Sequence, residues 1–261
     1  MKTPHHIQSV ILIGSGNVAT HLALGLLDKD IRIIQIFSPH ESHAFELAQK
    51  TKSEPISQLN KIDQTADLYL MAIPDGVIEP FAKQMPPVEG IVAHTSGFTP
   101  MKVLNRFKHY GVFYPLQTFS KNRTVDLSNI PFLLEAGDPT VMKQLKQLAM
   151  KLSQNIRPME SDERKRLHLA AVFVSNFNNY LYLLAREYLD EEGIDFNLLH
   201  PLIRETAAKA TEMDPHKAQT GPARRNDLKT LQAHLKLLEQ REEFRQFYEL
   251  FSNQILKRYH E

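Results

Sequence analysis

Short apolar runs alternate with amphipathic stretches through the first 160 residues of the chain. The runs are rich in Ile, Val, Leu and Phe, and they lie at 10–13, 31–37, 68–73, 91–93, 112–114, 132–134 and around Ile156. Unbroken apolar runs are typical of strands that are buried on both faces. The stretches between them, at 17–29, 41–52, 75–84, 100–107 and 139–153, have the spacing of helices. This alternation predicts an α/β fold with a doubly wound, mostly parallel sheet.

The pattern changes after Met159, because no convincing strand follows. Helices are predicted instead over 161–192, 196–213, 227–238 and 241–259. The first of them is apolar around most of its circumference, so it must be covered by other helices, by the first domain or by a second subunit. The sequence therefore predicts two domains, an α/β domain over 1–160 and an all-helical domain over 161–261.

The overall charge excludes two classes of partner. Lys plus Arg number 31 and Asp plus Glu number 30, which leaves a formal net charge of +1. Because the positive and negative charges nearly cancel, the chain provides no positive field for a nucleic-acid backbone or an anionic membrane, and we expect neither as a partner. The chain has no cysteine, which excludes thiolate chemistry and most structural zinc sites, and we expect no metal. Its apolar runs are too short to span a bilayer, so we expect a soluble, cytoplasmic protein.

A glycine-rich turn is the most informative segment of the chain. It follows the first apolar run and opens the next helix, and it reads Gly14, Ser15, Gly16, Asn17, Val18, Ala19. The first glycine permits a tight turn, the second lets backbone N–H groups approach a diphosphate, and the alanine lets the helix pack closely on the strand. The helix N-terminus adds unpaired donors and partial positive charge. We interpret residues 1–160 as a Rossmann dinucleotide-binding domain, against the alternative of an ordinary strand-to-helix turn.

The end of the second predicted strand bears on which dinucleotide binds. NAD-binding domains usually place an Asp or Glu there, whereas this chain has Phe37-Ser38-Pro39-His40. Ser38 and His40, with Ser42 or His43, can donate hydrogen bonds to a 2′-phosphate. The sequence therefore favours NADP, although NAD is not excluded because no Arg is present. The alternative for His40 and His43 is the solvated start of a helix.

Three further loops follow predicted strands, where ligands of open α/β sheets bind. The run at 68–73 ends at Ile73 and is followed by Pro74 and Asp75. Asp75 either caps the next helix or lines the cofactor edge. The next loop carries His94, a candidate proton donor or a structural histidine, and its neighbours Ser96 and Gly97 offer a hydroxyl and backbone donors to a substrate. In the third loop Gln117 is a candidate substrate-binding residue.

The predicted helical domain has two polar exceptions. His168, Ser175, Asn176 and Asn179 interrupt an apolar helix, and buried polar groups need partners. We consider His168 and Asn176 as catalytic candidates, and contacts with loops of the first domain are the alternative. The segment Thr220–Asp227 contains Arg224, which can hold an anionic group of the substrate or pair with nearby glutamates at the surface.

The ordered motifs IGSGNVA, AIPDGVI, HTSG, YPLQTF, HLAAVFVSNF and TGPARRND resemble a family of Rossmann-like proteins with a helical C-terminal domain. That family is labelled NADP oxidoreductase, deazaflavin-dependent type. The chain is more distantly similar to pyrroline-5-carboxylate reductase, the 3-hydroxyisobutyrate and 6-phosphogluconate dehydrogenases, and prephenate dehydrogenase. The resemblance implies an NADP-binding first domain, a second domain that dimerises and an active site in the cleft between them. It places Ser96 and Gly97 on the substrate side, with His168 and Asn176 facing the nicotinamide.

Several positions depart from the patterns of these relatives. Val172 stands where hydroxyacid dehydrogenases carry a catalytic Lys, Pro39 where the family favours Arg, and Tyr114 where His is more usual. The favoured hypothesis is an NADP-dependent oxidoreductase that transfers a hydride between NADP(H) and a small anionic substrate, with His94 or His168 handling the proton. The alternatives are a non-catalytic dinucleotide sensor or dimeric scaffold, and a prephenate-like dehydrogenase.

Overall fold

The computed structural model describes residues 6–260 and divides the chain into two compact units. The first unit extends to Ser175 and the second begins at Asn176. The division lies inside the long helical segment that starts at Ser161. The domain boundary at residue 160 stays a prediction from the sequence.

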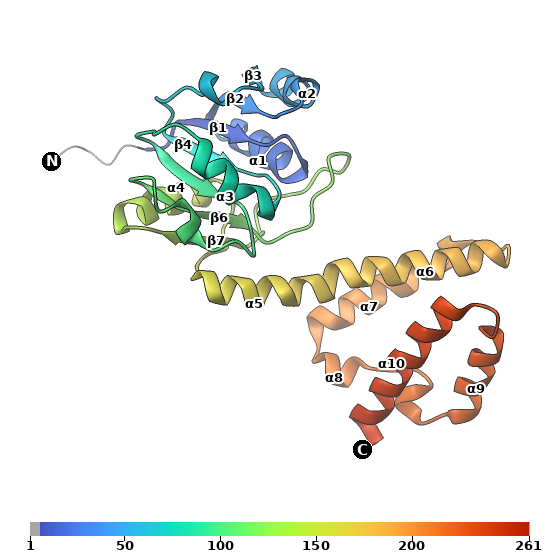
Figure 1. The fold of residues 1–261 in the computed structure, drawn as a ribbon. Coiled ribbons are helices and arrows are strands. Elements are labelled where there is room, and N and C mark those ends of the chain that lie inside the picture. The colour runs from blue at the N-terminus through green and yellow to red at the C-terminus, as the bar shows by residue number, and fades with distance from the viewer. Residues whose placement is uncertain (1–5, 261) are drawn as a thin grey trace. The chain divides into compact units, whose positions relative to one another are not determined.

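The first unit is built on one sheet of eight strands (Figure 1). The strands are β1 (Ser9–Ile13), β2 (Arg32–Phe37), β3 (Glu54–Ile56), β4 (Leu68–Met71), β5 (Ile91–His94), β6 (Tyr110–Pro115), β7 (Phe132–Ala136) and β8 (Ile156–Pro158). Their order across the sheet is β3-β2-β1-β4-β5-β6-β7-β8, and every neighbouring pair is parallel except β6 and β7. The predicted fold class, a mostly parallel doubly wound sheet followed by helices, is confirmed.

Helices cover both faces of the sheet because its central strands are apolar on both faces. Val10 and Leu12 of β1 pack into the core shared with α1 (Asn17–Leu27), α2 (Glu41–Thr51) and α4 (Pro139–Leu152). Ile11 and Ile13 point the other way, into the core shared with α3 (Asp75–Gln84) and the 3-10 turn η2 (Met101–Leu104). All four of these strand side chains have 0% exposure. The run at 10–13 is therefore apolar throughout because β1 is buried between two layers of helices.

Two elements of this unit differ from the predictions. The helix expected over 100–107 is only the single turn η2, and turns and bends connect it to the start of β6 at Tyr110. Strand β3 escaped prediction because it is three residues long and contains Pro55. Proline lacks the N–H that a central strand needs, but β3 lies at the edge of the sheet, where the loss is tolerated.

The parallel strands end together along one edge of the sheet. Ile13 lies opposite both Phe37 and Met71, and Met71 lies opposite His94. The strand order reverses between β1 and β4, since the chain passes from β1 to β2 on one side and returns to β4 on the other. In open α/β sheets such a reversal forms the crevice in which ligands bind. The predicted cofactor residues therefore converge at this edge.

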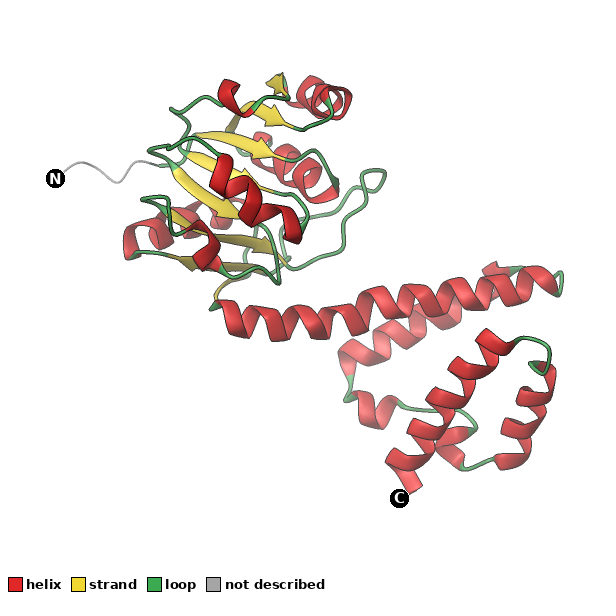
Figure 2. Cartoon of the chain, in the orientation of Figure 1, coloured by secondary structure: helices red, strands yellow, loops and turns green. Residues whose placement is uncertain are grey.

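Helices make up the rest of the chain, and all strands drawn in Figure 2 belong to the first unit. The helix predicted over 161–192 is α5 (Ser161–Val172), a π-helical turn at Phe173–Phe177, and α6 (Asn178–Glu191). The second unit continues with η4 (Phe196–Leu199), α7 (His200–Glu212), α8 (Pro215–Ala218), η5 (Ala223–Arg225), α9 (Leu228–Leu237) and α10 (Glu242–His260). Among the helices of residues 6–260, none combines the length and apolar character that a membrane crossing requires.

Candidate functional site at the carboxyl edge of the sheet

The turn after β1 can only be made by glycine at its first position. Gly14 has a φ of +113°, and its N–H donates to the carbonyl of Phe37 at 2.8 Å. A Cβ atom on Gly14 would lie 2.3 Å from the carbonyl oxygen of Ala72. Both the left-handed backbone and the close approach of the chain after β4 therefore exclude a side chain at this position.

The second glycine has the opposite surroundings. Gly16 is the N-cap of α1, and no side chain caps the helix there. A Cβ on Gly16 would find no atom within 4 Å, so the space above the first turn is open. The first N–H groups of a helix have no intrahelical partners and carry partial positive charge, and no acidic residue stands in the first turn of α1. This open, positively polarised turn can accept a phosphate group.

The other predicted residues of this turn surround that space. Ser15 is buried, Val18 is partly buried, and Asn17 is exposed at the start of the helix. The side-chain oxygen of Asn17 accepts a hydrogen bond from the backbone N–H of Lys121 at 3.2 Å. Asn17 thus contributes its backbone to the turn while its side chain holds a distant loop.

The end of β2 carries the residues predicted to select the dinucleotide. Ser38 is buried, its backbone N–H donates to Ile56, and its hydroxyl accepts from the N–H of His40 at 3.3 Å. His40 is the N-cap of α2, and its exposed ring lies 5.2 Å from the ring of His43. This corner therefore presents hydroxyl and imidazole donors.

The segment after β4 forms the facing side of the glycine turn. Ile73 is partly buried, and its Cγ2 atom would lie 3.1 Å from a Cβ on Gly14, so its side chain packs directly against the turn. Pro74 is the N-cap of α3 and Asp75 is its first residue. The Asp75 carboxylate is exposed but close enough to add to the raised pKa of Tyr114. Asp75 therefore brings a negative charge to the same edge.

His94 ends β5 with 0% exposure. Its Nδ1 atom accepts a hydrogen bond from the backbone N–H of Ser96 at 3.2 Å, so that nitrogen is unprotonated. Burial, together with the nearby Arg164 guanidinium, lowers the pKa of His94 to about 3. His94 is therefore a neutral histidine inside the unit at neutral pH.

Ser96 shapes the loop that follows. Its hydroxyl oxygen accepts hydrogen bonds from the backbone N–H groups of Phe98 at 3.0 Å and Thr99 at 2.7 Å. Ser96 is buried, in keeping with this role in the turn. Gln117, predicted to bind the same substrate, is exposed, and its side-chain oxygen accepts from the N–H of Thr118 at 2.8 Å.

Gly97 lies against a pair of side chains that come from two distant elements. The Tyr114 hydroxyl, at the end of β6, is 3.1 Å from Nδ1 of His168 on α5. A Cβ on Gly97 would lie 2.5 Å from Nδ1 of His168 and 2.8 Å from Cζ of Tyr114. Glycine at position 97 therefore leaves the room in which this tyrosine and histidine meet.

The Tyr114–His168 pair combines a protected and an accessible member. Tyr114 is 9% exposed, and burial, with the Asp75 charge, raises its pKa to about 12. Its hydroxyl therefore keeps its proton at neutral pH. His168 is partly exposed at the same place. The pair can hold and transfer a proton at the edge where the predicted cofactor would lie.

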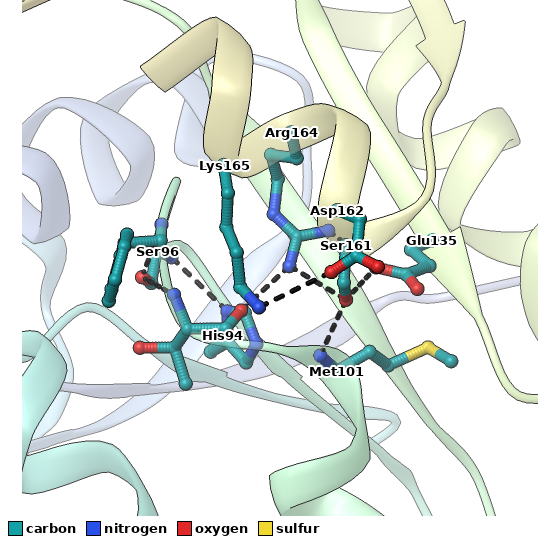
Figure 3. A network of polar contacts seen from close by, with 10 residues as sticks. His94, Ser96, Met101, Glu135, Ser161, Asp162, Arg164 and Lys165 are labelled. Atoms are coloured by element: carbon teal, nitrogen blue, oxygen red, sulfur yellow. Dashed lines mark hydrogen bonds and ion pairs between the residues drawn. The ribbon is translucent and has the colours of Figure 1, made fainter. Parts of the chain in front are cut away.

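A buried arginine fixes the start of α5 against the rest of the first unit (Figure 3). Arg164 has 0% exposure, and it donates to the carboxylate of Glu135 at 2.5 Å and to the carbonyl of Thr99 at 2.7 Å. Ser161 donates to the same carboxylate at 2.7 Å and accepts from the N–H of Met101 at 2.9 Å. One network thus ties α5 both to β7 and to the loop that carries Ser96 and Gly97.

Two predicted site residues belong to the second unit. Asn176 is an exposed residue of the π-helical turn, a local geometry that is frequent at functional sites. Arg224 is partly exposed, and its guanidinium lies 4.3 Å from the centre of the Tyr259 ring. The structure describes each within its own unit, and their roles stay predictions.

Sequence reasoning missed two features of this site. The sequence marks Tyr114 only as a departure from a family pattern, yet its hydroxyl lies 3.1 Å from Nδ1 of His168, 54 residues away along the chain. Arg164 lay unmarked in a helix whose other charged residues are exposed or partly exposed, and its position four residues before His168 was the only available signal. Within residues 6–260, no group of three or more His, Asp or Glu side chains is arranged to hold a metal ion.

Comparison with known proteins gives two matches to family models. Residues 9–93 match the model described as NADP oxidoreductase, coenzyme F420-dependent. Residues 130–255 match a domain of unknown function, DUF2520. No curated protein matches the chain.

Solved structures extend this likeness over nearly the whole chain. A protein from Bacteroides fragilis, described as a candidate NADP oxidoreductase, is 41% identical with a TM-score of 0.90, over 96% of this chain and 98% of the other. A Thermotoga maritima protein is 21% identical (TM-score 0.70; 95% and 98% covered). A 1-pyrroline-5-carboxylate reductase from Streptococcus pyogenes is 13% identical (TM-score 0.64; 96% and 97% covered). The last two share the fold, and the resemblance predicted from the motifs is confirmed.

Proposed function

This chain belongs to the family of NADP oxidoreductases that includes the Bacteroides fragilis protein, and on that premise we propose that it transfers a hydride between NADP(H) and a small, anionic substrate. The observation that carries the proposal is the glycine turn at the point where the strand order reverses. Position 14 requires glycine because of its positive φ and the close carbonyl oxygen of Ala72, while the space above Gly16 is open to a diphosphate. The residues present therefore fit a dinucleotide.

NADP fits the corner after β2 better than NAD does. The residues there, Ser38, Pro39 and His40, include no carboxylate to accept from a ribose 2′-hydroxyl or to repel a 2′-phosphate. Ser38 and His40 offer a hydroxyl and an imidazole at that position, and His43 lies beside His40. Each can donate a hydrogen bond to a phosphate oxygen.

When bound, NADPH supplies a hydride to the carbon of a C=O or C=N bond, and the oxygen or nitrogen of that bond then needs one proton. We assign this proton to His168. Nδ1 of His168 is hydrogen-bonded to the Tyr114 hydroxyl at 3.1 Å, so Tyr114 acts as the positioning residue that orients the imidazole. In this proposal the protonated imidazole gives its Nε2 proton to the substrate and is left neutral, and solvent returns the proton after turnover.

His94 is the weaker candidate for this proton. It is fully buried, its Nδ1 accepts from Ser96, and its pKa of about 3 keeps it neutral. Val172 stands where hydroxyacid dehydrogenases carry a catalytic lysine. A site without that lysine suits reduction of an imine or enamine better than oxidation of a hydroxyacid. Ser96, Gly97 and Gln117 remain the proposed substrate-side residues of the first unit, and Asn176 and Arg224 those of the second.

We also propose that the protein is a homodimer through its helical unit. Among residues 176–260, the buried apolar side chains are only Leu184, Ala223, Leu231 and Leu238. Leu198 is 71% exposed and Leu202 is 61% exposed. Large apolar side chains exposed in this way are typical of surfaces that associate. Light scattering should report a dimer for the native chain and a monomer for Leu202→Glu, while Phe45→Glu, an exposed apolar residue of the first unit, serves as the control.

Cofactor binding is tested by thermal shift with NADP, NADPH, NAD and NADH. A ligand at 100 times its dissociation constant adds about 2.7 kcal/mol of stability. Gly16→Val should fold like the native chain, because the space around a Cβ is open, but should lose the shift. Absence of a shift with all four nucleotides in the native protein would refute the proposal.

Turnover is tested with NADPH and a panel of cyclic imines and 2-keto acids, and with NADP and reduced deazaflavin. His168→Ala should lose most of its kcat, and Tyr114→Phe should alter the pH profile of kcat more than the KM. Binding without turnover of any compound would identify a dinucleotide sensor instead. Oxidation of prephenate with NADP would identify the prephenate-like alternative.

A further inference from the structure

The loop between β6 and β7, which runs beside α1 in Figure 1, is held against the start of that helix. The carbonyl of Ser120 accepts a hydrogen bond from Nε2 of His21 at 3.0 Å, and the Phe119 ring lies 4.9 Å from the His21 ring. One residue further, the N–H of Lys121 donates to the side chain of Asn17. The loop therefore brings Lys121 to the first residue of α1, across 104 residues of sequence.

The side chain of Lys121 extends from α1 towards α2. Its Nζ atom is 3.9 Å from the carboxylate of Glu46, which also lies 3.8 Å from Nζ of Lys50. Neither distance is a hydrogen bond, so both ion pairs are loose. The Lys121 side chain is 33% exposed, and its ammonium has only the 3.9 Å contact with Glu46 as its ion pair.

The two phosphate-binding segments at this edge supply no cation to a bound dinucleotide. Neither the glycine turn at 14–19 nor the segment 37–45 contains Lys or Arg. The diphosphate carries negative charge, and a 2′-phosphate adds about −1.5 to −2 at neutral pH. Charge-assisted hydrogen bonds from a cation are the usual means of binding such groups. Lys121 contacts α1 at its first residue, Asn17, and α2 at Glu46, in the middle of that helix.

We propose that Lys121 binds a phosphate group of the nicotinamide dinucleotide, exchanging its loose contact with Glu46 for the phosphate oxygens. This inference rests on the proposed function. It assigns a binding residue that is remote in sequence from both phosphate-binding segments, and it explains how a corner that lacks Arg can still hold NADP.

The test measures dissociation constants of NADP and NAD by calorimetry for the native chain, Lys121→Ala and Lys50→Ala. Lys50 is the matched control, because it pairs with the same carboxylate but lies in the last turn of α2. Lys121→Ala should raise the dissociation constant of NADP tenfold or more and reduce its dependence on salt. Lys50→Ala should change the dissociation constant of NADP less than twofold. Lys121→Arg should retain binding.

The NAD measurement distinguishes the two phosphate groups. A loss for NADP alone assigns Lys121 to the 2′-phosphate, and an equal loss for both nucleotides assigns it to the diphosphate. Unchanged binding of both would overturn this inference and leave the proposed function standing, whereas a native chain that binds neither would overturn both.

A purely structural role for Lys121 predicts a different outcome for its partner. If the ion pair served only to hold the loop, Glu46→Gln would weaken NADP binding as Lys121→Ala does. If Lys121 binds a phosphate, Glu46→Gln should instead lower the dissociation constant of NADP severalfold, because a competing carboxylate is removed. Weaker binding in Glu46→Gln would contradict the proposed exchange.

Discussion

The two units of this chain differ in how much of their apolar surface they cover. In the first unit, the apolar side chains of β1 and β4 have 0% exposure and lie between two layers of helices. In residues 176–260, four apolar side chains are buried, while Leu198, Leu202 and Leu237 are each more than 60% exposed. The first unit has a complete core of its own, and we infer that the helical unit completes its core by association.

This difference separates two ways in which a substitution can act. At the sheet edge, close backbone contacts determine the site, so that Gly14 and Gly97 have neighbours where a side chain would be. In the helical unit, Gly193 and Gly221 have positive φ angles but nothing within 4 Å of a Cβ. Substitutions in the first unit should therefore change its own stability and binding, and those in the second should change assembly.

The largest expected effect compares two glycines with similar backbone angles. Gly14→Ala meets both an unfavourable φ of +113° and a backbone oxygen 2.3 Å from its Cβ, so it should cost about 4 kcal/mol or more. Gly221→Ala has a φ of +101° but open space, so it should cost about 1–2 kcal/mol. Chemical unfolding of both variants measures the difference. Equal losses would show that the first unit is no more tightly packed than the second.

The second effect is a dependence on pH that is specific to the first unit. His94 has a pKa of about 3 in the folded chain, against 6.5 for the ordinary side chain. The unfolded chain therefore binds the extra proton between these values, so stability is complete above pH 6.5 and falls as the pH is lowered towards 3. By pH 5 the loss from this group should be about 2 kcal/mol.

His94→Asn isolates this contribution. Asparagine can accept the hydrogen bond from Ser96 through its side-chain oxygen but does not titrate. The difference in unfolding free energy between the native chain and the variant should shrink, or change sign, from pH 7 to pH 5. A difference that stays constant over this range would mean that His94 is not shielded from solvent.

Local patterns were sufficient to predict the sheet, most helices and the glycine turn. The strand β1 and the helix α1 follow from the run at 10–13 and the spacing after Asn17, and the turn between them needs glycine for reasons of backbone geometry alone. These features depend on neighbours in sequence. Strand β3 was missed because Pro55 is informative only once its place at the sheet edge is known.

The side-chain partnerships of the site could not be predicted in the same way. The hydrogen bond between Tyr114 and His168 and the ion pair between Arg164 and Glu135 form only because α5 lies against the ends of β6 and β7. No spacing rule connects such distant residues. The fully buried position of His94 was also hidden, because a histidine at the end of a strand can point to either side.

The smallest expected effect compares one helix cap in each unit. Asp138 caps α4, accepting from the N–H groups of Thr140 and Val141, and Asp227 caps α9, accepting from that of Thr230. Replacement by alanine should cost about 1 kcal/mol at either position, and Asp→Asn, which keeps the acceptor, should cost less.

Calorimetry then separates the units by size and by association. A loss of about 1 kcal/mol moves the Tm of a 60–100-residue unit by about 4–8 °C and that of a 150–250-residue unit by about 2–4 °C. Asp227→Ala should therefore shift one transition further than Asp138→Ala shifts the other. If the proposed dimer forms, only the transition moved by Asp227→Ala should depend on protein concentration, because association would stabilise the helical unit by mass action. A single transition, moved equally by both variants at every concentration, would show that the two units unfold as one and that the helical unit needs no partner.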